Sequence, residues 1–240
     1  MKTPDSDADI DVESWVLEET NILENTFRFT DVTGSYDANS AEFKPLGDEP
    51  FSYNIVGLTG CTAMVLLSKR GIYIAHYFEN IAFNKDRNSP YKSQQTAFLH
   101  TVQQGLRRGR LNEQVSLASN AIAIDDDSLH GFLIIPKTGP GNDNTQIVED
   151  PYREWWEKIK TTVGSILPRL NDPGRWHEYK YAPQQEEQIV RDEQGEAIYE
   201  PIWATSSGRV LFKYDPDHNG RKKTLLYFEK ERMEAANMEW

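Results

Sequence analysis

The residues of this chain that could carry out covalent chemistry lie in one short stretch. The segment GLTGCTAMVLLSKRGIYIAHYFEN, residues 57–80, contains the only cysteine, Cys61, and a histidine fifteen residues later, His76. A thiolate can attack a carbonyl or carboxamide carbon, and a neighbouring histidine can then protonate the leaving nitrogen. Gly60 lets a substrate approach the backbone, so that N–H groups can stabilise an oxyanion. These residue types predict a cysteine nucleophile with a histidine as its acid and base.

A β-hairpin would position these two residues. If residues 62–67 and 72–78 are strands joined by a two-residue loop within SKRG, the numbers of paired residues sum to 139. His76 then lies opposite Ala63 and diagonal to Cys61 on the same face, at roughly 7–8 Å between backbones. A register shifted by one residue would separate the two groups onto opposite faces, and the loop lacks the usual Gly or Asn. The predicted pair therefore depends on this turn.

The same residues also fit a protein without catalytic activity. Free cysteine is among the most buried residue types, and CTAMVLL reads as a strand of the core. In that interpretation Cys61 is an inert buried thiol and His76 is a core histidine. The chain would then be a binding protein that uses its aromatic-rich C-terminal sheet as a surface.

The motif LTGC at 58–61, followed by His76 on a strand, resembles the LSGC-type motif of bacterial toxin glutamine deamidases. This is the cytotoxic necrotizing factor and Burkholderia lethal factor group, and chemoreceptor glutamine deamidases share the same order of cysteine and histidine. The resemblance implies a β-sandwich core, no cofactor and a protein substrate carrying a glutamine. It also implies that Cys61 forms a thioester with loss of ammonia and that His76 is the general base and acid.

Two positions differ from the family pattern. The serine of the motif is Thr59 here, which keeps a hydroxyl beside Gly60. The third catalytic element, in several members a threonine six residues before the cysteine, corresponds to Ile55. In the necrotizing-factor type a backbone carbonyl has this orienting role, so Ile55 or Val56 could supply it, and Asn54 is a side-chain alternative.

Two related activities remain open from the sequence. Transglutamination is the same chemistry with an amine in place of water. A cysteine peptidase is a further alternative, but papain-type folds seat the cysteine at a helix N-terminus, whereas Cys61 begins a strand-like run.

Composition restricts the other classes of function. A formal charge of −12 over 240 residues disfavours a nucleic-acid partner, which needs clustered Lys and Arg. The sequence contains no run of 18 apolar residues, so we expect no membrane span. The histidines show no metal-ligand spacing, so we expect no metal. The acidic start of the chain lacks the apolar region of a signal peptide, which leaves an intracellular protein or a mature secreted form. The oligomeric state is open.

The helices and strands predicted from the sequence indicate an α+β fold, with a β-sandwich-like core and two main flanking helices. Residues 1–14 read as a disordered acidic tail, and residues 15–240 as a single domain whose part from 173 to 230 is rich in strands. One helix lies within residues 91–111, where Phe98, Val102 and Leu106 form an apolar stripe with Leu99 beside it.

The clearest helix follows Asp150, which can cap it. Its apolar stripe is made of Trp155, Ile159, Val163 and Ile166. Residues 131–137, GFLIIPK, read as a buried strand that Pro136 ends.

Overall fold

The computed structural model describes residue 4 and residues 10–22, 39–85, 89–110, 114–140, 147–183, 187–191, 197–201 and 205–240. It contains both helices and several sheets, which confirms the predicted α+β class. The chain divides into two compact units: Met1–Arg28, Asp48–Thr59 and Pro183–Trp240 form the first, and Phe29–Gly47 and Gly60–Ala182 form the second. The single domain over residues 15–240 and the sandwich packing of its sheets stay predictions.

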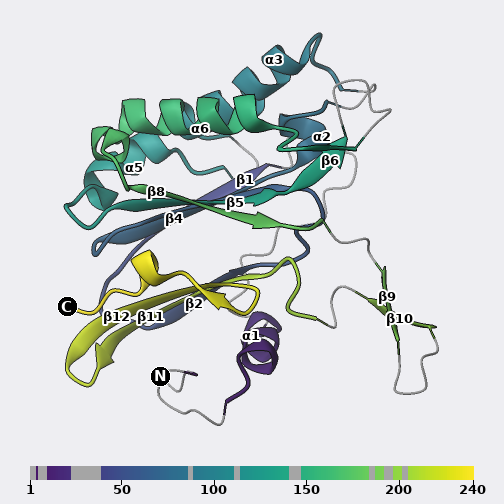
Figure 1. The fold of residues 1–240 in the computed structure, drawn as a ribbon. Coiled ribbons are helices and arrows are strands. Elements are labelled where there is room, and N and C mark those ends of the chain that lie inside the picture. Colours follow the sequence, from purple (N-terminus) through teal and green to yellow (C-terminus); the bar gives the residue numbers. More distant parts are fainter. Residues whose placement is uncertain are drawn as a thin grey trace. The chain divides into compact units, whose positions relative to one another are not determined.

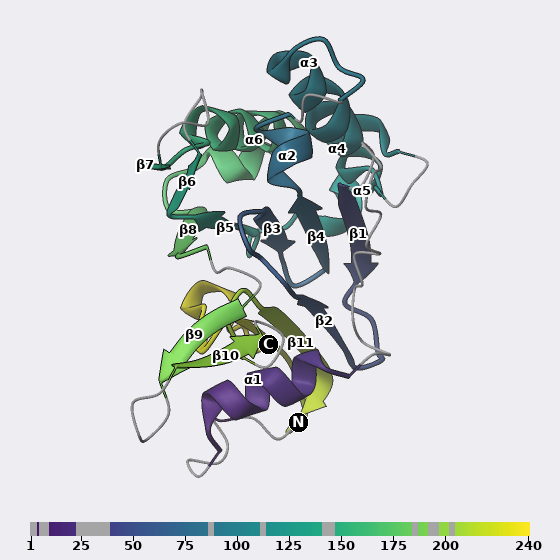
Figure 2. The ribbon, with the colours of Figure 1, turned by 90° about the vertical axis from the view of Figure 1, so that its right-hand side faces the viewer.

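The second unit is built on a five-stranded sheet in the order β1-β4-β3-β5-β8 (Figures 1 and 2). The strands are β1 (Ser40–Pro45), β3 (Thr62–Leu67), β4 (Gly71–Tyr77), β5 (His130–Pro136) and β8 (Trp176–Tyr181). The pairs β1/β4, β4/β3 and β3/β5 are antiparallel, whereas β5 and β8 are parallel. The predicted strand ending at Pro136 is confirmed, and it is buried along nearly its whole length.

The β3–β4 hairpin has the predicted register. Ala63 pairs with His76, and every pair from Thr62↔Tyr77 to Leu67↔Ile72 has numbers that sum to 139. The N–H of Ser68 donates a hydrogen bond of 3.0 Å to the carbonyl of Gly71, which closes the two-residue loop. The hydroxyl of Ser128 accepts a hydrogen bond of 2.8 Å from the N–H of Lys69. A tertiary contact thus supports a loop whose own sequence is not typical of tight hairpin turns.

Helices cover one face of this sheet (Figure 1). They are α2 (Glu79–Ala82), α3 (Gln94–Phe98), a π-helical turn (Leu99–Gln103), α4 (Gln104–Arg108), α5 (Leu117–Ile124) and α6 (Arg153–Ile166). The elements from α3 to α4 follow one another without a break and form the helix predicted within residues 91–111. Phe98, Val102 and Leu106 are buried in the core as predicted, and Leu99 beside them is 41% exposed.

Helix α6 supplies the largest side chain of this core. Trp156 is fully buried, together with Ile159 and Val163 of the same helix. Trp155 and Ile166, which were predicted to share one stripe with them, are only partly buried and pack against the edge of the core. The centre of the buried face therefore lies at Trp156 rather than at Trp155.

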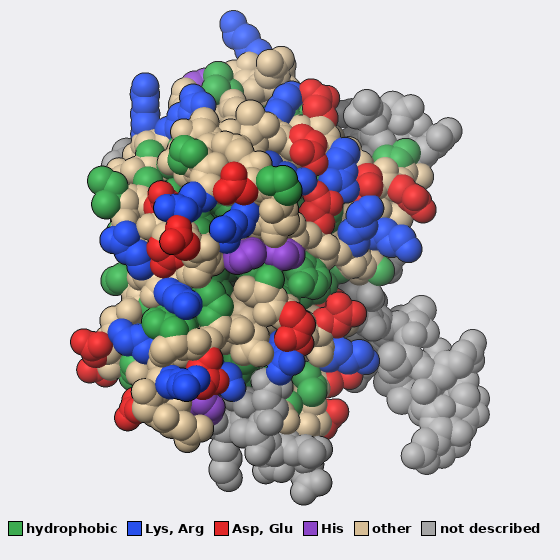
Figure 3. All heavy atoms as spheres, turned by 60° about the vertical axis from the view of Figure 1, so that its left-hand side comes forward, with side chains coloured by type: hydrophobic (Ala, Val, Ile, Leu, Met, Phe, Trp, Pro, Cys, Tyr) green, Lys and Arg blue, Asp and Glu red, His purple; other side chains and the backbone are tan. Residues whose placement is uncertain are grey.

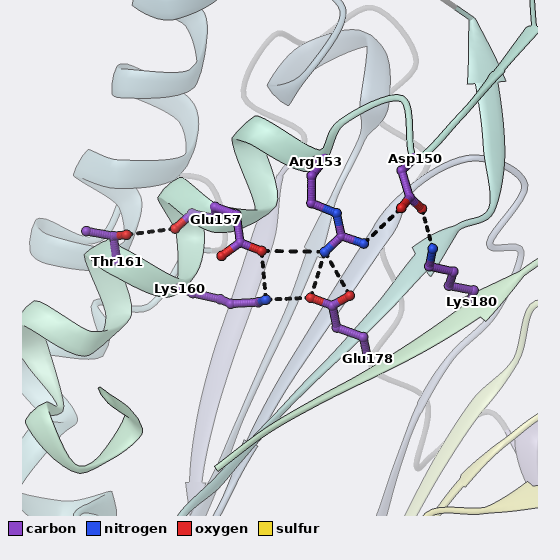
Figure 4. Close-up of polar contacts among 7 residues, drawn as sticks. All are labelled: Asp150, Arg153, Glu157, Lys160, Thr161, Glu178 and Lys180. Carbon is purple, nitrogen blue, oxygen red and sulfur yellow. Dashed lines mark hydrogen bonds and ion pairs between the residues drawn. The ribbon is translucent and has the colours of Figure 1, made fainter. Parts of the chain in front are cut away.

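The predicted cap of α6 is wrong. Asp150 has a φ of 46° and lies two residues before Tyr152, the residue that precedes the helix. Its carboxylate pairs instead with Arg153 at 3.2 Å and with Lys180 at 2.6 Å (Figure 4). Each carboxylate oxygen thus pairs with one base, so the side chain of Asp150 binds other side chains instead of capping the helix.

An ion-pair network joins α6 to β8 beside this acid (Figure 4). Both carboxylate oxygens of Glu178 accept hydrogen bonds of 2.8 Å from Arg153, and Lys160 contacts the same carboxylate. Glu157 contacts both bases at 3.4 and 2.9 Å. Burial raises the pKa of Glu178, but the two bases outweigh this and lower it. The network holds β8, the strand that ends at Tyr181, against the helix.

The remaining elements of the second unit are short. A small hairpin pairs β6 (Thr138–Pro140) with β7 (Ile147–Glu149), and a 3-10 helix spans Pro168–Asn171. Arg169 of that helix pairs with Asp125 at 3.1 Å and with Asp127 at 2.5 Å.

The first unit contains a four-stranded antiparallel sheet in the order β13-β12-β11-β2. The strands are β2 (Phe51–Ile55), β11 (Val210–His218), β12 (Arg221–Phe228) and β13 (Glu231–Arg232). A separate hairpin pairs β9 (Glu187–Arg191) with β10 (Ala197–Pro201). Four of these strands, together with β8, make the region from 173 to 230 rich in strands, as predicted. The β11–β12 turn has positive φ at Asn219 and Gly220, as two-residue hairpin turns require.

Helix α1 (Val12–Thr20) packs on this sheet through Trp15 and Val16. The side chain of Asp11 accepts a hydrogen bond of 2.8 Å from the N–H of Ser14 and caps the helix. The acidic tail predicted over residues 1–14 therefore extends too far, because residues 12–14 already belong to the helix. Acidic residues favour a helix N-terminus, where they meet unpaired N–H groups.

Candidate active site around Cys61

Cys61 lies directly before β3 and is fixed by two other elements. Its carbonyl accepts a hydrogen bond of 2.7 Å from the hydroxyl of Tyr181, the last residue of β8. The hydroxyl of Thr62, the next residue, accepts a hydrogen bond of 3.0 Å from the indole N–H of Trp156 on α6. Cys61 itself is 8% exposed. The backbone on both sides of the thiol is thus held by buried aromatic side chains.

Glu79, at the start of α2, is an acidic residue that contacts this segment. Its backbone N–H donates a hydrogen bond to the thiol of Cys61. Its carboxylate lies over Gly60, where an added Cβ would be 2.6 Å from Oε2. The hydroxyl of Tyr152 donates a hydrogen bond of 3.3 Å to the same oxygen. Only glycine at position 60 leaves room for this carboxylate in its present position.

The surroundings of the thiol favour its protonated form. The pKa of Cys61 is raised to about 12, first by burial and also by the Glu79 carboxylate, against the lowering effect of the Glu79 N–H. Burial also raises the pKa of Glu79 itself, against the lowering effect of the hydrogen bond from Tyr152. The pKa values of Tyr152 and Tyr181 are raised as well, first by burial. At neutral pH Cys61 is therefore a thiol and not a thiolate.

His76 lies in the middle of the sheet, paired with Ala63 of β3 on one side and Ser40 of β1 on the other. It is 3% exposed, and its ring packs against Phe78 with centroids 4.4 Å apart. Burial lowers the pKa of His76 to about 3, so the imidazole is neutral at physiological pH. Neither member of the predicted pair carries a charge in this structure.

The register confirms that His76 lies opposite Ala63, two residues after Cys61. Cys61 itself precedes β3 and is not part of the paired register, so its position on the same face as His76 stays a prediction. Within the described part of the chain, the groups that affect the ionisation of the thiol are its buried surroundings and Glu79, and His76 is not one of them. A hydrogen bond between the thiol and the imidazole therefore stays a prediction.

The residues proposed as a third element belong to the first unit, whereas Cys61 and His76 belong to the second. Asn54 lies on β2, and its side-chain amide donates a hydrogen bond of 3.2 Å to the carbonyl of Thr20. Ile55 pairs with Val210 of β11, and Val56 follows the strand. Thr59 is exposed. Their assignment as orienting or oxyanion-supporting residues also stays a prediction.

Three neighbours of Cys61 were not found from the sequence: Glu79, Tyr152 and Tyr181. The hairpin contained a signal for the first, because the sum of 139 places Glu79 opposite Gly60 when the pairing is continued beyond the strand. The two tyrosines have no local signal, since their positions depend on α6 and on the parallel pairing of β5 with β8.

Comparisons of the chain with known protein families, with characterised proteins and with solved structures found no match. Among the described residues there is no group of three or more His, Cys, Asp or Glu side chains that could hold a metal ion. No helix in the described ranges is long and apolar enough to cross a membrane. The function must therefore be argued from the residues of the site.

Proposed function

We propose that this protein is a cysteine-dependent amidohydrolase that deamidates glutamine side chains of a target protein. The observation that carries the proposal is the register of β3 and β4, which pairs His76 with Ala63, two residues after Cys61, and so supports a diagonal arrangement of His76 and Cys61. Diagonal neighbours in a sheet are close enough for side chains to interact. The LTGC motif supplies the second argument, through its resemblance to toxin glutamine deamidases.

The protonation states restrict the mechanism. Since both groups are neutral, His76 would remove the thiol proton as Cys61 attacks the side-chain amide carbon. The imidazolium would then protonate the leaving nitrogen, releasing ammonia and leaving a thioester. In the second half His76 would take a proton from water, which cleaves the thioester to give glutamate and the free thiol. The N–H of Glu79 contacts the sulfur and Gly60 directly precedes Cys61, so these two positions would supply donors to an oxyanion.

A second candidate function is favoured by the burial of the site. A thiol with a pKa of about 12 beside a carboxylate is poorly suited to be a nucleophile. In that case Cys61 fills the core, and the protein is a binding protein without catalytic activity.

The alkylation rate of Cys61 separates the two candidates. Because the chain has one cysteine, the mass of the whole protein reports the modification of this site alone. We would measure the iodoacetamide rate at several pH values in the native protein, in His76→Gln and in His100→Gln, a control that removes a histidine from the α3–α4 helix. General-base assistance is worth about 10²–10⁴-fold, so His76→Gln should lower the native rate at neutral pH by at least tenfold.

Equal rates in the native protein and in His76→Gln would contradict the proposal. So would alkylation that occurs only after unfolding in urea. If the rate depends on His76, release of ammonia from glutamine-rich proteins such as casein is the next measurement, with Cys61→Ser as the control that must be inactive.

A further inference from the structure

The parallel pairing of β5 with β8 brings together two histidines that lie 47 residues apart in the sequence. Nδ1 of His130 and Nε2 of His177 are 3.0 Å apart, and their ring centroids are separated by 5.2 Å. Phe132 is the direct partner of His177 in the register, so His130 is its diagonal neighbour on the same face of the sheet. Nothing in the proposed chemistry of Cys61 uses this pair.

The pair is accessible and is supported by an apolar surface. Both histidines are partly exposed, and histidine side chains lie in contact with one another at the surface in Figure 3. The ring of His177 stacks on Phe132, with centroids 5.1 Å apart and an interplanar angle of 22°. Phe132 itself is fully buried, so the ring that supports the pair is immobilised by the core.

A hydrogen bond between two imidazole nitrogens needs one proton between them. At 3.0 Å, one N–H therefore bridges Nδ1 of His130 and Nε2 of His177.

We infer that His130 and His177 form a surface site for a divalent first-row transition metal ion. Cu²⁺ should bind most tightly, and Ni²⁺ and Zn²⁺ more weakly. Imidazole suits these three metals, and Cu²⁺ is bound most tightly in the series. When a metal lies about 2.0–2.1 Å from each of two nitrogens, the nitrogens are about 2.9 Å apart if the N–metal–N angle is a right angle and about 3.3 Å apart if it is tetrahedral. The observed 3.0 Å lies within this range.

Binding requires the two rings to reorient so that both lone pairs point to one position. The proton that bridges the nitrogens moves to the other nitrogen of its ring, so both imidazoles stay neutral. Since the described residues offer no third ligand of the usual types, the other coordination positions are open to water or to a donor from another molecule.

Arg175 limits the affinity of this site. Its guanidinium donates hydrogen bonds to the carbonyls of Asp127 at 2.9 Å and Leu129 at 3.3 Å, which holds its positive charge close to His130. A cation repels a metal ion, so removing this charge should strengthen binding. Arg175→Gln keeps a hydrogen-bond donor and removes the charge, which makes it a variant with an expected gain.

The test is a calorimetric titration of the whole protein with Cu²⁺, followed by electron paramagnetic resonance. We expect one ion per chain at this site, with hyperfine coupling to two nitrogens. His130→Asn and His177→Asn should each weaken binding by at least about tenfold, because even the loss of an outer-shell partner of a metal ligand costs about 10–100-fold in affinity. Arg175→Gln should strengthen binding. His100→Asn and His218→Asn are the matched controls and should leave the affinity unchanged. Ca²⁺ and Mg²⁺, which prefer oxygen ligands, should not bind there.

Binding that survives in His130→Asn and His177→Asn, or that falls equally in the controls, would overturn the assignment. A second measurement uses the unmodified protein, so its result does not depend on whether the variants fold. Substoichiometric Cu²⁺ should broaden the imidazole NMR signals of His130 and His177 before those of the other histidines. Broadening of another histidine first would also refute the site. Neither result depends on the reactivity of Cys61.

Discussion

The pH dependence of stability tests the neutral state of His76. Burial disfavours the protonated form of His76, so its pKa is lower in the folded chain than in the unfolded chain: about 3, against an ordinary value of 6.5. The unfolded state therefore binds more protons than the folded state below pH 6.5, and stability falls as the pH is lowered. A preformed thiolate–imidazolium pair predicts the opposite sign, because a raised folded pKa adds stability at low pH.

The magnitude follows from these two pKa values. Between pH 7 and pH 5 the unfolded histidine becomes almost fully protonated, while folded His76 stays neutral. The difference in proton binding lowers the free energy of unfolding by about 2 kcal/mol over this interval. Since urea m-values are about 1–3 kcal/mol per molar, the urea midpoint should fall by roughly 1 M through this residue alone.

The assay is urea unfolding of the native protein and of His76→Gln at pH 7 and pH 5. All other titratable groups are common to both proteins, so the difference between their pH effects isolates His76. We expect the native protein to lose about 2 kcal/mol more than His76→Gln. A second variant, His76→Leu, should behave as His76→Gln does. Equal losses in all three proteins, or a smaller loss in the native protein, would refute the assignment of a buried neutral imidazole.

Two further changes probe the neighbourhood of Cys61, and a third probes the packing between β5 and β8. Glu79→Gln removes the carboxylate that raises the pKa of Cys61, so alkylation between pH 7 and 9.5 should become faster; a slower reaction would show that Glu79 acts as a base. Tyr181→Phe leaves the buried Cys61 carbonyl without its 2.7 Å hydrogen bond and should lower the free energy of unfolding in urea by about 1–3 kcal/mol, whereas an unchanged midpoint would mean that this bond adds nothing. Gly131→Ala places a Cβ 2.6 Å from the ring of Trp176 and should cost about 1–3 kcal/mol of overpacking in the same assay; a neutral result would show that the ring can move aside.

The hairpin that carries Cys61 could be predicted because its information is local. The period of two in a strand and the length of the loop together fix which residues face one another. Ala63 and His76 were therefore paired correctly, even though the loop residues are not those of a common hairpin turn. The apolar stripe of Phe98, Val102 and Leu106 could be predicted for a similar reason, since it follows from helical spacing alone.

Contacts between distant segments could not be predicted in this way. Asp150 was predicted as the helix cap, but it lies two residues before the N-cap residue Tyr152, and Arg153 and Lys180 bind its carboxylate. Lys180 reaches it only because β8 pairs in parallel with β5, and no local pattern contains that pairing. The same pairing brings together His130 and His177, whose separation in sequence matches no metal-binding motif.

The ionisation of the site is the feature that the sequence predicts least well. The same burial that stabilises the hairpin also keeps its reactive groups uncharged. The ionisable residue that acts on Cys61 is the acid Glu79, which disfavours a thiolate, and His76 is too buried to be protonated. If Cys61 is a nucleophile, the proton must move to His76 during the attack and not before it. The rate should then be nearly independent of pH between about 5 and 9, since neither group titrates there. A bell-shaped profile within that range would instead require a charged pair, and with it a different arrangement of β3 and β4 around the substrate.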